Sequence, residues 1–367
     1  MIVNKTLLLL FVPFCFGKSV EVTFKDVTFK GFSVYTEKFK KTIPSGNKLV
    51  DFLPERTVYD AIEMKEQHIP VLTKGSLADL DQLDELVIEY CDVEEIESGA
   101  ISNVPNLRKL SLKGNAIKSI AKDIFSHLGI STLDLSLNQI SFIHSQAFDN
   151  MPELLNIQLA DNFITQWNPE WLKNTPLLTR ISVQNNSIEK LPAHSFKNMA
   201  GEKKYGKIDL SINLVFSHNK ISEIDPKAFS DLNRINNLWL DNNVLESFDE
   251  NLLTGIKIND LRLNKNNIKC LDGNLDKILK AETNHIDSNP FDCDCLGRIK
   301  EWSNKKKNVD FTFAEMECTA QRIKVKMTAL EKRLKELKGE RDVPKEVEEI
   351  EVFETKPKDR AIKFIRI

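Results

Sequence analysis

The fold is decided by the stretch Leu107-Arg-Lys-Leu-Ser-Leu-Lys-Gly-Asn-Ala-Ile117, whose pattern LxxLxLxxNxI recurs along the chain. A second copy spans Ile130–Ile140. In two degenerate copies, Gln67 and Cys91 stand in place of the asparagine. Further full copies have their asparagine at Asn162, Asn186, Asn219, Asn243, Asn266 and, at the end of the array, Asn289. From Gln67 to Asn289 the intervals are 24, 24, 23, 24, 24, 33, 24, 23 and 23 residues. A period held this often indicates a stacked repeat architecture.

The pattern carries its own physical reason. In a strand, alternate side chains point to opposite faces, so the two leucines of LxL share one face and the residue between them takes the other. One repeat cannot bury its apolar face alone, and stacked repeats form a continuous core with one long open sheet surface. The asparagine amide is expected to satisfy backbone groups that would otherwise be buried without partners. A second apolar column follows ten residues after each ladder position and should belong to the core: Ile101, Phe125, Phe148, Leu172, Phe196, Phe229 and Leu253.

Between about Tyr59 and Cys318 the sequence resembles the extracellular leucine-rich-repeat family, including insect immune and cell-adhesion members. The resemblance implies an α/β solenoid with a curved parallel sheet on its concave face and an irregular or short helical outer arc. We therefore expect five segments: a signal peptide (1–17), an N-terminal cap without cysteines (18–57), an array of about ten repeats (58–289), a cysteine-rich C-terminal cap (290–318) and a charged helical tail (319–367). The alternating runs Val20–Phe24 and Val27–Phe29 predict a hairpin that covers the first repeat.

The C-terminal cap is identified by the run Asn289–Cys295, with Trp302 and Cys318 after it. In the family this cap holds four cysteines, but no cysteine follows Cys318, and Cys270 is the available substitute. The resemblance implies two disulfides among Cys270, Cys293, Cys295 and Cys318, with the pairing left open. Cys91 is then left without a disulfide partner in the chain. It is expected to be either a buried thiol or part of an intermolecular disulfide.

Composition limits the classes of function. Hydrophobic residues make up 41% and charged residues 29% of the chain, which fits a folded soluble protein, and a formal charge of −3 argues against a nucleic-acid-binding surface. Lys5, the apolar run Leu7–Phe16 and Gly17 predict a cleaved signal peptide. That run is shorter than the roughly 20 residues that span a bilayer, and no later stretch is long enough. The protein is expected to be secreted, without a membrane span.

The period breaks once, where Gly201–Lys207 precedes two competing registers that end at Asn213 and Asn219. Only Asn219 keeps the usual interval to Asn243, so we assign Asn219 to the ladder and nine extra residues to a loop. The loop is read as a protruding binding element, as a tolerated insertion or as an error in the predicted gene.

The tail contains a short heptad seam at Ile323, Met327, Leu330, Leu334 and Leu337. Gly339 and Pro344 end it. The seam predicts either a dimerisation coil through residues 323–337 or a helix that packs on the cap or frays. Residues 347–367 have the alternation of a further hairpin.

The residue between the two leucines of each repeat should line the concave face: Glu63, Val87, Ser111, Asp134, Gln158, Ser182, Val215, Trp239, Arg262 and His285. The C-terminal third of this row gathers Val215, Trp239, Arg262 and His285 around Asp241, and Trp beside Arg is the composition of an interface hot spot. We predict a binding patch there. Asn185-Asn-Ser187 is an acceptor motif for an N-linked glycan at the margin of the sheet.

No GxSxG, phosphate-binding glycine loop or HExxH motif is present, and the six histidines follow no metal-ligand spacing. The sequence therefore predicts a protein that is not an enzyme and needs no cofactor or metal. The expected function is extracellular recognition of another protein or a cell-surface glycoconjugate, in innate immunity or cell adhesion by analogy with the family. The competing prediction is a structural spacer of the matrix or cell surface.

Overall fold

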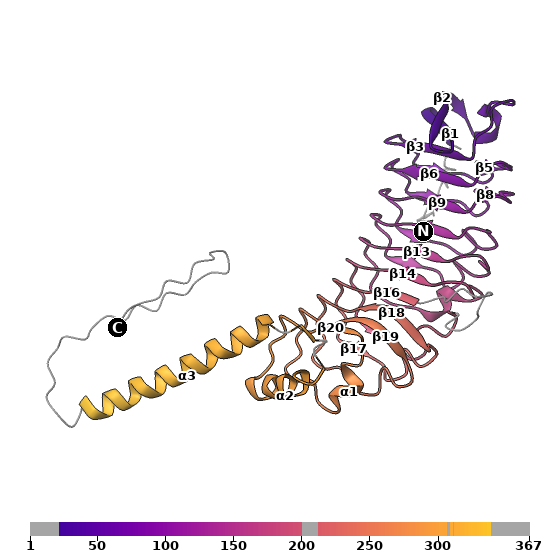
Figure 1. Cartoon of the computed structure of the whole chain (residues 1–367). Helices are drawn as coiled ribbons and strands as arrows, with labels where there is room; N and C mark the ends of the chain where they lie inside the picture. Colours follow the sequence, from indigo (N-terminus) through magenta and orange to yellow (C-terminus); the bar gives the residue numbers. More distant parts are fainter. Residues whose placement is uncertain (1–21, 200–211, 307–308, 311, 339–367) are drawn as a thin grey trace, which may run out of the picture. The chain divides into compact units, whose positions relative to one another are not determined.

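The computed structural model describes residues 22–199, 212–306, 309–310 and 312–338 (Figure 1). The chain forms two compact units, Met1–Glu315 and Met316–Ile367. The predicted signal peptide, the extra residues Gly201–Lys207 and the C-terminal hairpin at 347–367 lie outside the described residues.

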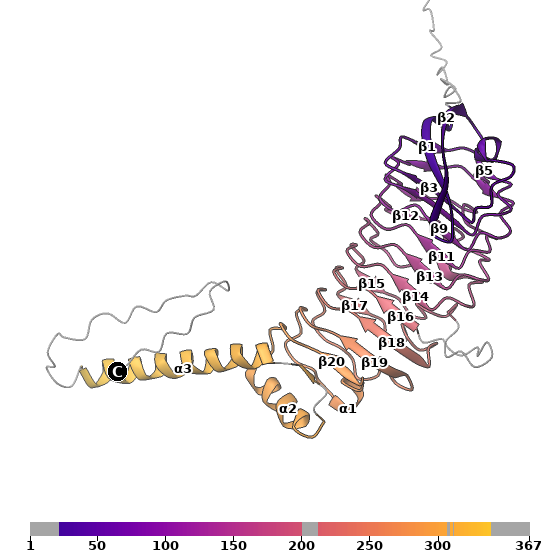
Figure 2. The same cartoon turned by 45° about the horizontal axis from the view of Figure 1, so that its top comes forward.

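The first unit is a solenoid whose successive turns each add one strand to a single large sheet (Figure 2). Among the described residues this sheet has thirteen strands, in the order β2-β1-β3-β6-β9-β11-β13-β14-β16-β18-β19-β20-β21. All neighbours from β3 onward pair in parallel. The strands are β3 (Ala61–Lys65), β6 (Glu85–Glu89), β9 (Lys109–Ser111), β11 (Thr132–Asp134), β13 (Asn156–Gln158), β14 (Arg180–Ser182), β16 (Ile212–Val215), β18 (Arg234–Trp239), β19 (Lys257–Arg262), β20 (Thr283–His285) and β21 (Val309–Asp310).

The opposite side of each turn is built from short pieces. Four two-residue pairings, β4-β7, β5-β8, β10-β12 and β15-β17, link neighbouring turns. These elements are β4 (Val71–Leu72), β5 (Leu77–Ala78), β7 (Glu95–Ile96), β8 (Ile101–Ser102), β10 (Ser119–Ile120), β12 (Phe142–Ile143), β15 (Lys190–Leu191) and β17 (Glu223–Ile224), with the 3-10 helices η1 (Leu49–Phe52) and η2 (Pro169–Leu172) and the short helix α1 (Leu275–Ile278). The predicted fold class is confirmed.

Aromatic side chains fill the core beneath this outer arc. Phe125 and Phe148 stack with ring centroids 6.0 Å apart, and Phe196 and Phe229 stack at 5.5 Å. All four are fully buried, as is expected for the predicted second apolar column. Truncating such a side chain to Ala typically costs about 3–5 kcal/mol, so this column contributes strongly to the stability of the array.

The asparagine ladder satisfies the backbone at the turn after each strand. Asn138 shows the pattern: its Nδ2 donates to Leu135 O at 3.1 Å and to Leu112 O of the preceding turn at 2.9 Å. Its Oδ1 accepts from the backbone of Ile117 at 3.2 Å. Asn115, Asn162, Asn186, Asn219, Asn243, Asn266 and Asn289 repeat the scheme. The assignment of Asn219, rather than Asn213, to the ladder is thereby confirmed.

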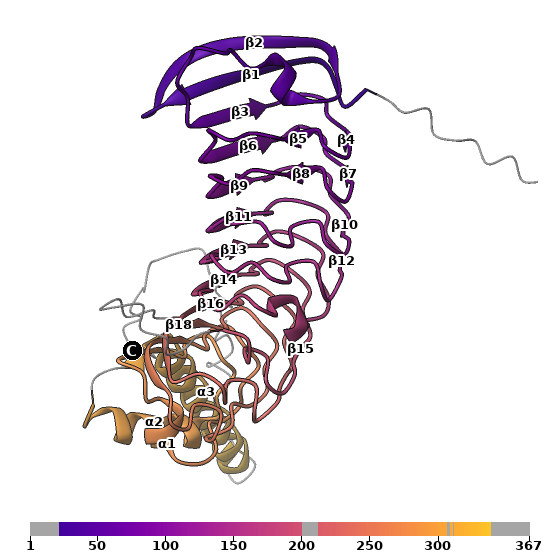
Figure 3. The ribbon, with the colours of Figure 1, turned by 90° about the vertical axis from the view of Figure 1, so that its right-hand side faces the viewer.

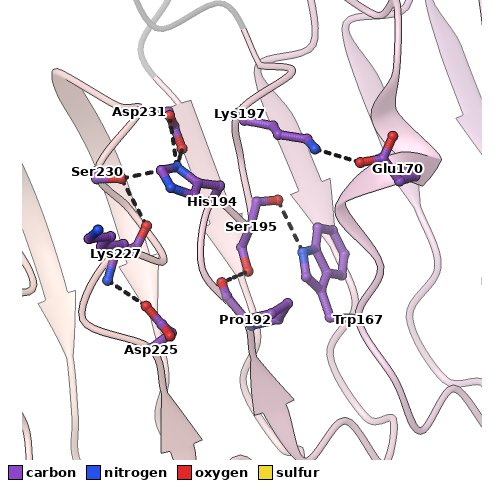
Figure 4. Close-up of polar contacts among 10 residues, drawn as sticks. All are labelled: Trp167, Glu170, Pro192, His194, Ser195, Lys197, Asp225, Lys227, Ser230 and Asp231. Carbon is purple, nitrogen blue, oxygen red and sulfur yellow. Dashed lines mark hydrogen bonds and ion pairs between the residues drawn. The ribbon is translucent and has the colours of Figure 1, made fainter.

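Polar side chains also tie neighbouring turns together on the outer arc (Figure 4). Trp167 Nε1 donates to Ser195 O at 3.1 Å, and Lys197 Nζ lies 2.5 Å from Glu170 Oε1 of η2. The buried indole N–H thus has the partner that it needs.

The N-terminal cap is a hairpin, but it lies further along the chain than the sequence predicts. β1 (Phe24–Ser33) pairs antiparallel with β2 (Thr36–Gly46) and with β3, so Val27–Phe29 is the middle of one strand. The turn falls at Val34–Tyr35, where both residues have positive φ (49° and 64°). Alternation of side chains cannot locate a turn that lacks glycine or asparagine. Phe24, Phe29 and Ile43 are fully buried and close the first turn of the core.

The C-terminal cap contains α2 (Cys293–Ser303), whose N-terminus is capped by Asp292 accepting from Cys295 N at 2.7 Å. Cys270 and Cys295 form a disulfide, and Cys293 is also disulfide-bonded. The side chain of Cys318 lies outside the described residues.

The tail forms one helix, α3 (Thr312–Lys338), in the segment where the heptad seam predicts it. Its described side chains, at 319–320 and 323–336, are all exposed.

Candidate interaction surface

Strand register places the ten predicted sheet residues in one row. Glu63 lies opposite Val87, Val87 opposite Ser111, and the pairing continues without a break through Val215, Trp239 and Arg262 to His285. We call the sheet surface that carries this row the open sheet face. The middle of the row is small and polar, as in Ser111, whose Oγ donates to Glu89 Oε1 at 2.6 Å.

At the C-terminal end of the row, four side chains form what we call the Trp239 cluster: Trp239, Asp260, Arg262 and His285. The Arg262 guanidinium lies over the Trp239 ring, 3.9 Å from its centroid. Asp260 Oδ2 accepts from Trp239 Nε1 at 2.7 Å and from Arg262 Nε at 3.1 Å. The other oxygen, Oδ1, lies 3.2 Å from His285 Nε2. One carboxylate therefore holds three large side chains in fixed positions.

The cluster remains accessible to a partner. The side chains of Arg262 and His285 are 38% and 33% exposed, and Trp239 is partly exposed. A cation stacked on an aromatic ring is attracted by the ring quadrupole, by about 0.5–1 kcal/mol at an exposed site. Because the stack already exists in the chain alone, a partner would meet an ordered surface and would lose less conformational entropy on binding.

Two of the five residues of the predicted patch do not face solvent, which corrects that prediction. Val215 is 3% exposed and Asp241 is 9% exposed. Asp241 is occupied within the sheet, because its Oδ1 accepts from Ser217 Oγ at 2.6 Å and its Oδ2 from Asn242 Nδ2 at 2.7 Å. Val215 is a short side chain in the same row as the much larger Trp239.

Sequence reasoning missed Asp260, the centre of the cluster. It lies two residues before Arg262 on β19, in the next outward column of the sheet, opposite Asn237 and Thr283. The available signal was the outward position preceding each LxL leucine, since alternation puts it on the same face.

A Ser–His–Asp group on the outer arc does not form a catalytic triad (Figure 4). Asp231 and Ser230 both approach the same atom of His194, Nδ1, at 3.1 and 3.4 Å. A triad needs the serine and the carboxylate on opposite ring nitrogens, so that the imidazole can accept a proton from one while the other orients it.

Within the described part of the chain, no group of three or more His, Cys, Asp and Glu side chains is arranged to hold a metal ion. Over the same residues, no helix combines the length and apolar character needed to cross a membrane.

Two family models match this chain. The model described as leucine rich repeat matches residues 81–140, 105–162 and 129–188, and the model described as BspA type leucine rich repeat region matches residues 209–275. These matches and the solenoid show that the chain is built from leucine-rich repeats.

Two curated proteins are similar to this chain over part of their own length. CD180 antigen from Mus musculus is 26% identical over 254 residues, which cover 66% of this chain and 38% of the relative. Keratocan from Mus musculus is 26% identical over 213 residues, which cover 55% of this chain and 56% of the relative. The chain thus spans 38% and 56% of the length of these two relatives.

Solved structures share the fold at low identity. The Toll–Spatzle complex, described as a hub in Drosophila development and innate immunity, contains a chain with a TM-score of 0.56 and 17% identity, covering 64% of this chain and 32% of that one. The mouse RP105/MD-1 complex gives a TM-score of 0.54 and 20% identity, covering 70% and 48%.

Proposed function

We propose that this chain is an extracellular, non-enzymatic recognition protein that binds another protein through the Trp239 cluster. The observation that carries the proposal is the stack of Arg262 on Trp239, held by Asp260 on an otherwise small and polar sheet face. Trp and Arg are the residue types most enriched in interface hot spots, where they bring large contact area and fixed geometry.

Two further observations support an extracellular role. The Cys270–Cys295 disulfide is of a kind that persists in oxidising compartments. Among structures with the same fold, one is a complex of Toll with Spatzle and another a complex of RP105 with MD-1, which supports a protein as the partner of this chain.

The geometry favours a protein over a cell-surface glycoconjugate as the partner. A sugar ring recognised by tryptophan stacks on the face of the indole, and one face of Trp239 is already covered by the Arg262 guanidinium at 3.9 Å. A protein can instead make polar contacts to Arg262 and His285, whose side chains are 38% and 33% exposed.

The test is affinity capture with the full chain and two variants, Trp239→Ala and Arg262→Ala, from body fluid of the source organism, followed by measurement of Kd for the captured partner. Each truncation is expected to weaken binding by about 2 kcal/mol or more, which is about 30-fold. Circular dichroism and the thermal midpoint verify that the variants fold.

The chain supplies its own matched control. In the C-terminal cap, Lys306 lies over the Trp302 ring at 5.7 Å, and Trp302 Nε1 donates to Asp276 Oδ1 at 3.1 Å. Trp302→Ala and Lys306→Ala remove the same kinds of contact away from the open sheet face and should leave Kd unchanged. Equal affinity of all four variants would overturn the proposal.

For the biological process we propose innate immunity or cell adhesion, by analogy with leucine-rich-repeat relatives. An immune role predicts that transcript and protein rise after infection. The competing role, a structural spacer of the matrix, predicts steady developmental expression and a Kd for neighbouring molecules that is insensitive to Trp239→Ala.

A further inference from the structure

A pocket of about 470 Å³ lies at the other end of the open sheet face, where the N-terminal hairpin meets β3, β6 and β9. The hairpin extends past the beginning of β3, because Phe32 already pairs with Ala61 and the chain continues to the turn at Val34–Tyr35 (Figure 3). The pocket therefore has one wall from the hairpin and another from the sheet.

The hairpin wall is apolar and unusually exposed. Tyr35 is 94% exposed and Val34 is 77% exposed. Tyrosine in such a position offers a large rigid surface with a polar tip, the property that enriches it at binding interfaces.

The sheet wall is acidic. It carries Asp60, Glu63, Asp84 and Glu85, and the one basic side chain that lines it is Lys109. Glu63 pairs with Lys65 at 2.9 Å and Glu85 with Lys109 at 3.5 Å. The Asp84 carboxylate has no hydrogen bond or ion pair with the described residues, and Asp60 accepts only from Val34 N at 3.4 Å. The two aspartates therefore retain their capacity to accept hydrogen bonds from a ligand.

Among the described residues, no three His, Cys, Asp or Glu side chains form a group that could hold a metal ion. The acids lie on β3 and β6 and at the positions just before these strands. They match a cation that presents several N–H donors on a long side chain, and guanidinium is the group that pairs best with carboxylates.

We propose that this pocket, which we call the hairpin pocket, binds a basic segment of another polypeptide. An Arg or Lys side chain enters between Asp60 and Asp84, and a neighbouring apolar side chain packs against Tyr35. This site is separate from the Trp239 cluster, which lies on β18, β19 and β20, and it does not depend on the function proposed for that cluster.

The probe is a short acetylated and amidated peptide of alternating Arg and Leu, compared with the same peptide carrying Gln in place of Arg and with spermine. Binding to the full chain is measured by fluorescence anisotropy. The Arg/Leu peptide is expected to bind at least tenfold more tightly than the Gln/Leu peptide, and more weakly when the salt is raised to about 1 M, where the Debye length falls to about 3 Å.

Variants separate the two walls. Asp60→Asn with Asp84→Asn and, separately, Tyr35→Ala are each expected to weaken peptide binding about tenfold, that is by about 1.4 kcal/mol. The matched control is Asp51→Asn with Glu55→Gln, which removes two exposed charges of the same cap outside the pocket and should leave affinity within twofold. Because Tyr35 is almost fully exposed, its truncation does not threaten folding.

The outcomes are distinct. Equal binding of the Arg/Leu and Gln/Leu peptides, or full affinity of the Asp60/Asp84 variant, would overturn the proposal. If the Asp60/Asp84 change weakens the binding of spermine and of the peptide equally, and Tyr35→Ala has no effect on either, the pocket is a general cation site. That outcome would also overturn the proposal. Trp239→Ala should leave peptide binding unchanged, so failure here and failure of the proposed function are distinguishable.

Discussion

Cys91 shows how one residue departs from the ladder and what that departure does. It stands at a ladder position, is fully buried and is the free cysteine among the described residues. Its Sγ lies 3.4 Å from Met64 O and 3.2 Å from Glu89 O. In the next turn, Asn115 stands at the same position, and its Nδ2 donates to Ile88 O, the carbonyl equivalent to Met64 O. A thiol is a weaker donor than an amide, so this turn relies more on burial. The buried-thiol reading fits this environment, because an intermolecular disulfide would need the sulfur at the surface.

We predict a pH dependence of stability from this thiol. Burial raises the pKa of Cys91 from 9.0 to about 11, so between these values the folded state retains a proton that the unfolded state releases. The stabilisation is complete below about pH 9 and is lost as pH rises toward 11, at about 1.4 kcal/mol per pH unit. Urea unfolding at pH 9 and 10 should show wild type losing about 1 kcal/mol more stability than Cys91→Ala, because at pH 9 the unfolded thiol is already half ionised. Cys91→Ala is the control that cancels the titration of lysines and tyrosines. Rapid alkylation of folded Cys91 at neutral pH would contradict the burial on which this depends.

At this scale the sequence predicts best where the repeat itself dictates the residue. Each ladder asparagine is required by the same backbone groups, so its position and partners follow from the period. Asp260 could not be found in this way, because the repeat leaves its outward position free and only the packing of Trp239, Arg262 and His285 gives it a role. Val215 likewise reads as outward from alternation, and only its neighbours decide that it is buried.

Apolar side chains lie exposed along the described part of α3. Ile323, Met327, Leu330 and Leu334 are 53%, 40%, 59% and 54% exposed, and they form the predicted heptad seam. The fifth residue of the seam, Leu337, has its side chain outside the described residues. An exposed stripe with this spacing is the surface that a second helix covers in a coiled coil.

We predict that two copies of the chain pair weakly through residues 323–337. Sedimentation velocity should show a mass that rises from monomer to dimer with concentration, and Leu330→Glu with Leu334→Glu should abolish the rise, because two buried charges would face each other across the seam. Val325→Glu is the control, since Val325 is 70% exposed but off the seam. A monomer at all concentrations would favour a helix that frays or packs elsewhere.

Across the whole molecule, the solenoid spaces two different surfaces along one sheet. The hairpin pocket involves β3, β6 and β9, and the Trp239 cluster involves β18, β19 and β20, with small polar residues between them. The periodic sequence predicts that such a sheet exists and which residues line it. It does not predict the pocket, because the hairpin is outside the period and its turn can be placed only through pairing with β3.

The predicted glycan at Asn185 would stand beside the middle of this sheet. Asn185 is exposed, has φ 55°, and its Nδ2 donates to Asp161 Oδ1 at 2.8 Å, while the adjacent Asn186 is buried in the ladder. The residue therefore lies at the margin where the chain leaves β14, accessible to a transferase but beside the open sheet face. A glycan at this point would shield the central turns and leave both ends of the sheet free.

We predict that protein secreted from eukaryotic cells has an intact mass above that of the polypeptide without its predicted signal peptide, and that both Asn185→Gln and Ser187→Ala remove the excess. Ser187→Ala is the matched variant, because it destroys the acceptor motif while the Asn185–Asp161 hydrogen bond is retained. Since the glycan lies away from both ends, its loss should change the affinity of the hairpin pocket and of the Trp239 cluster by less than twofold. A mass equal to that of the polypeptide would show that Asn185 carries no glycan. A large change in affinity at either site would mean that the sugar reaches further along the sheet than its attachment point implies.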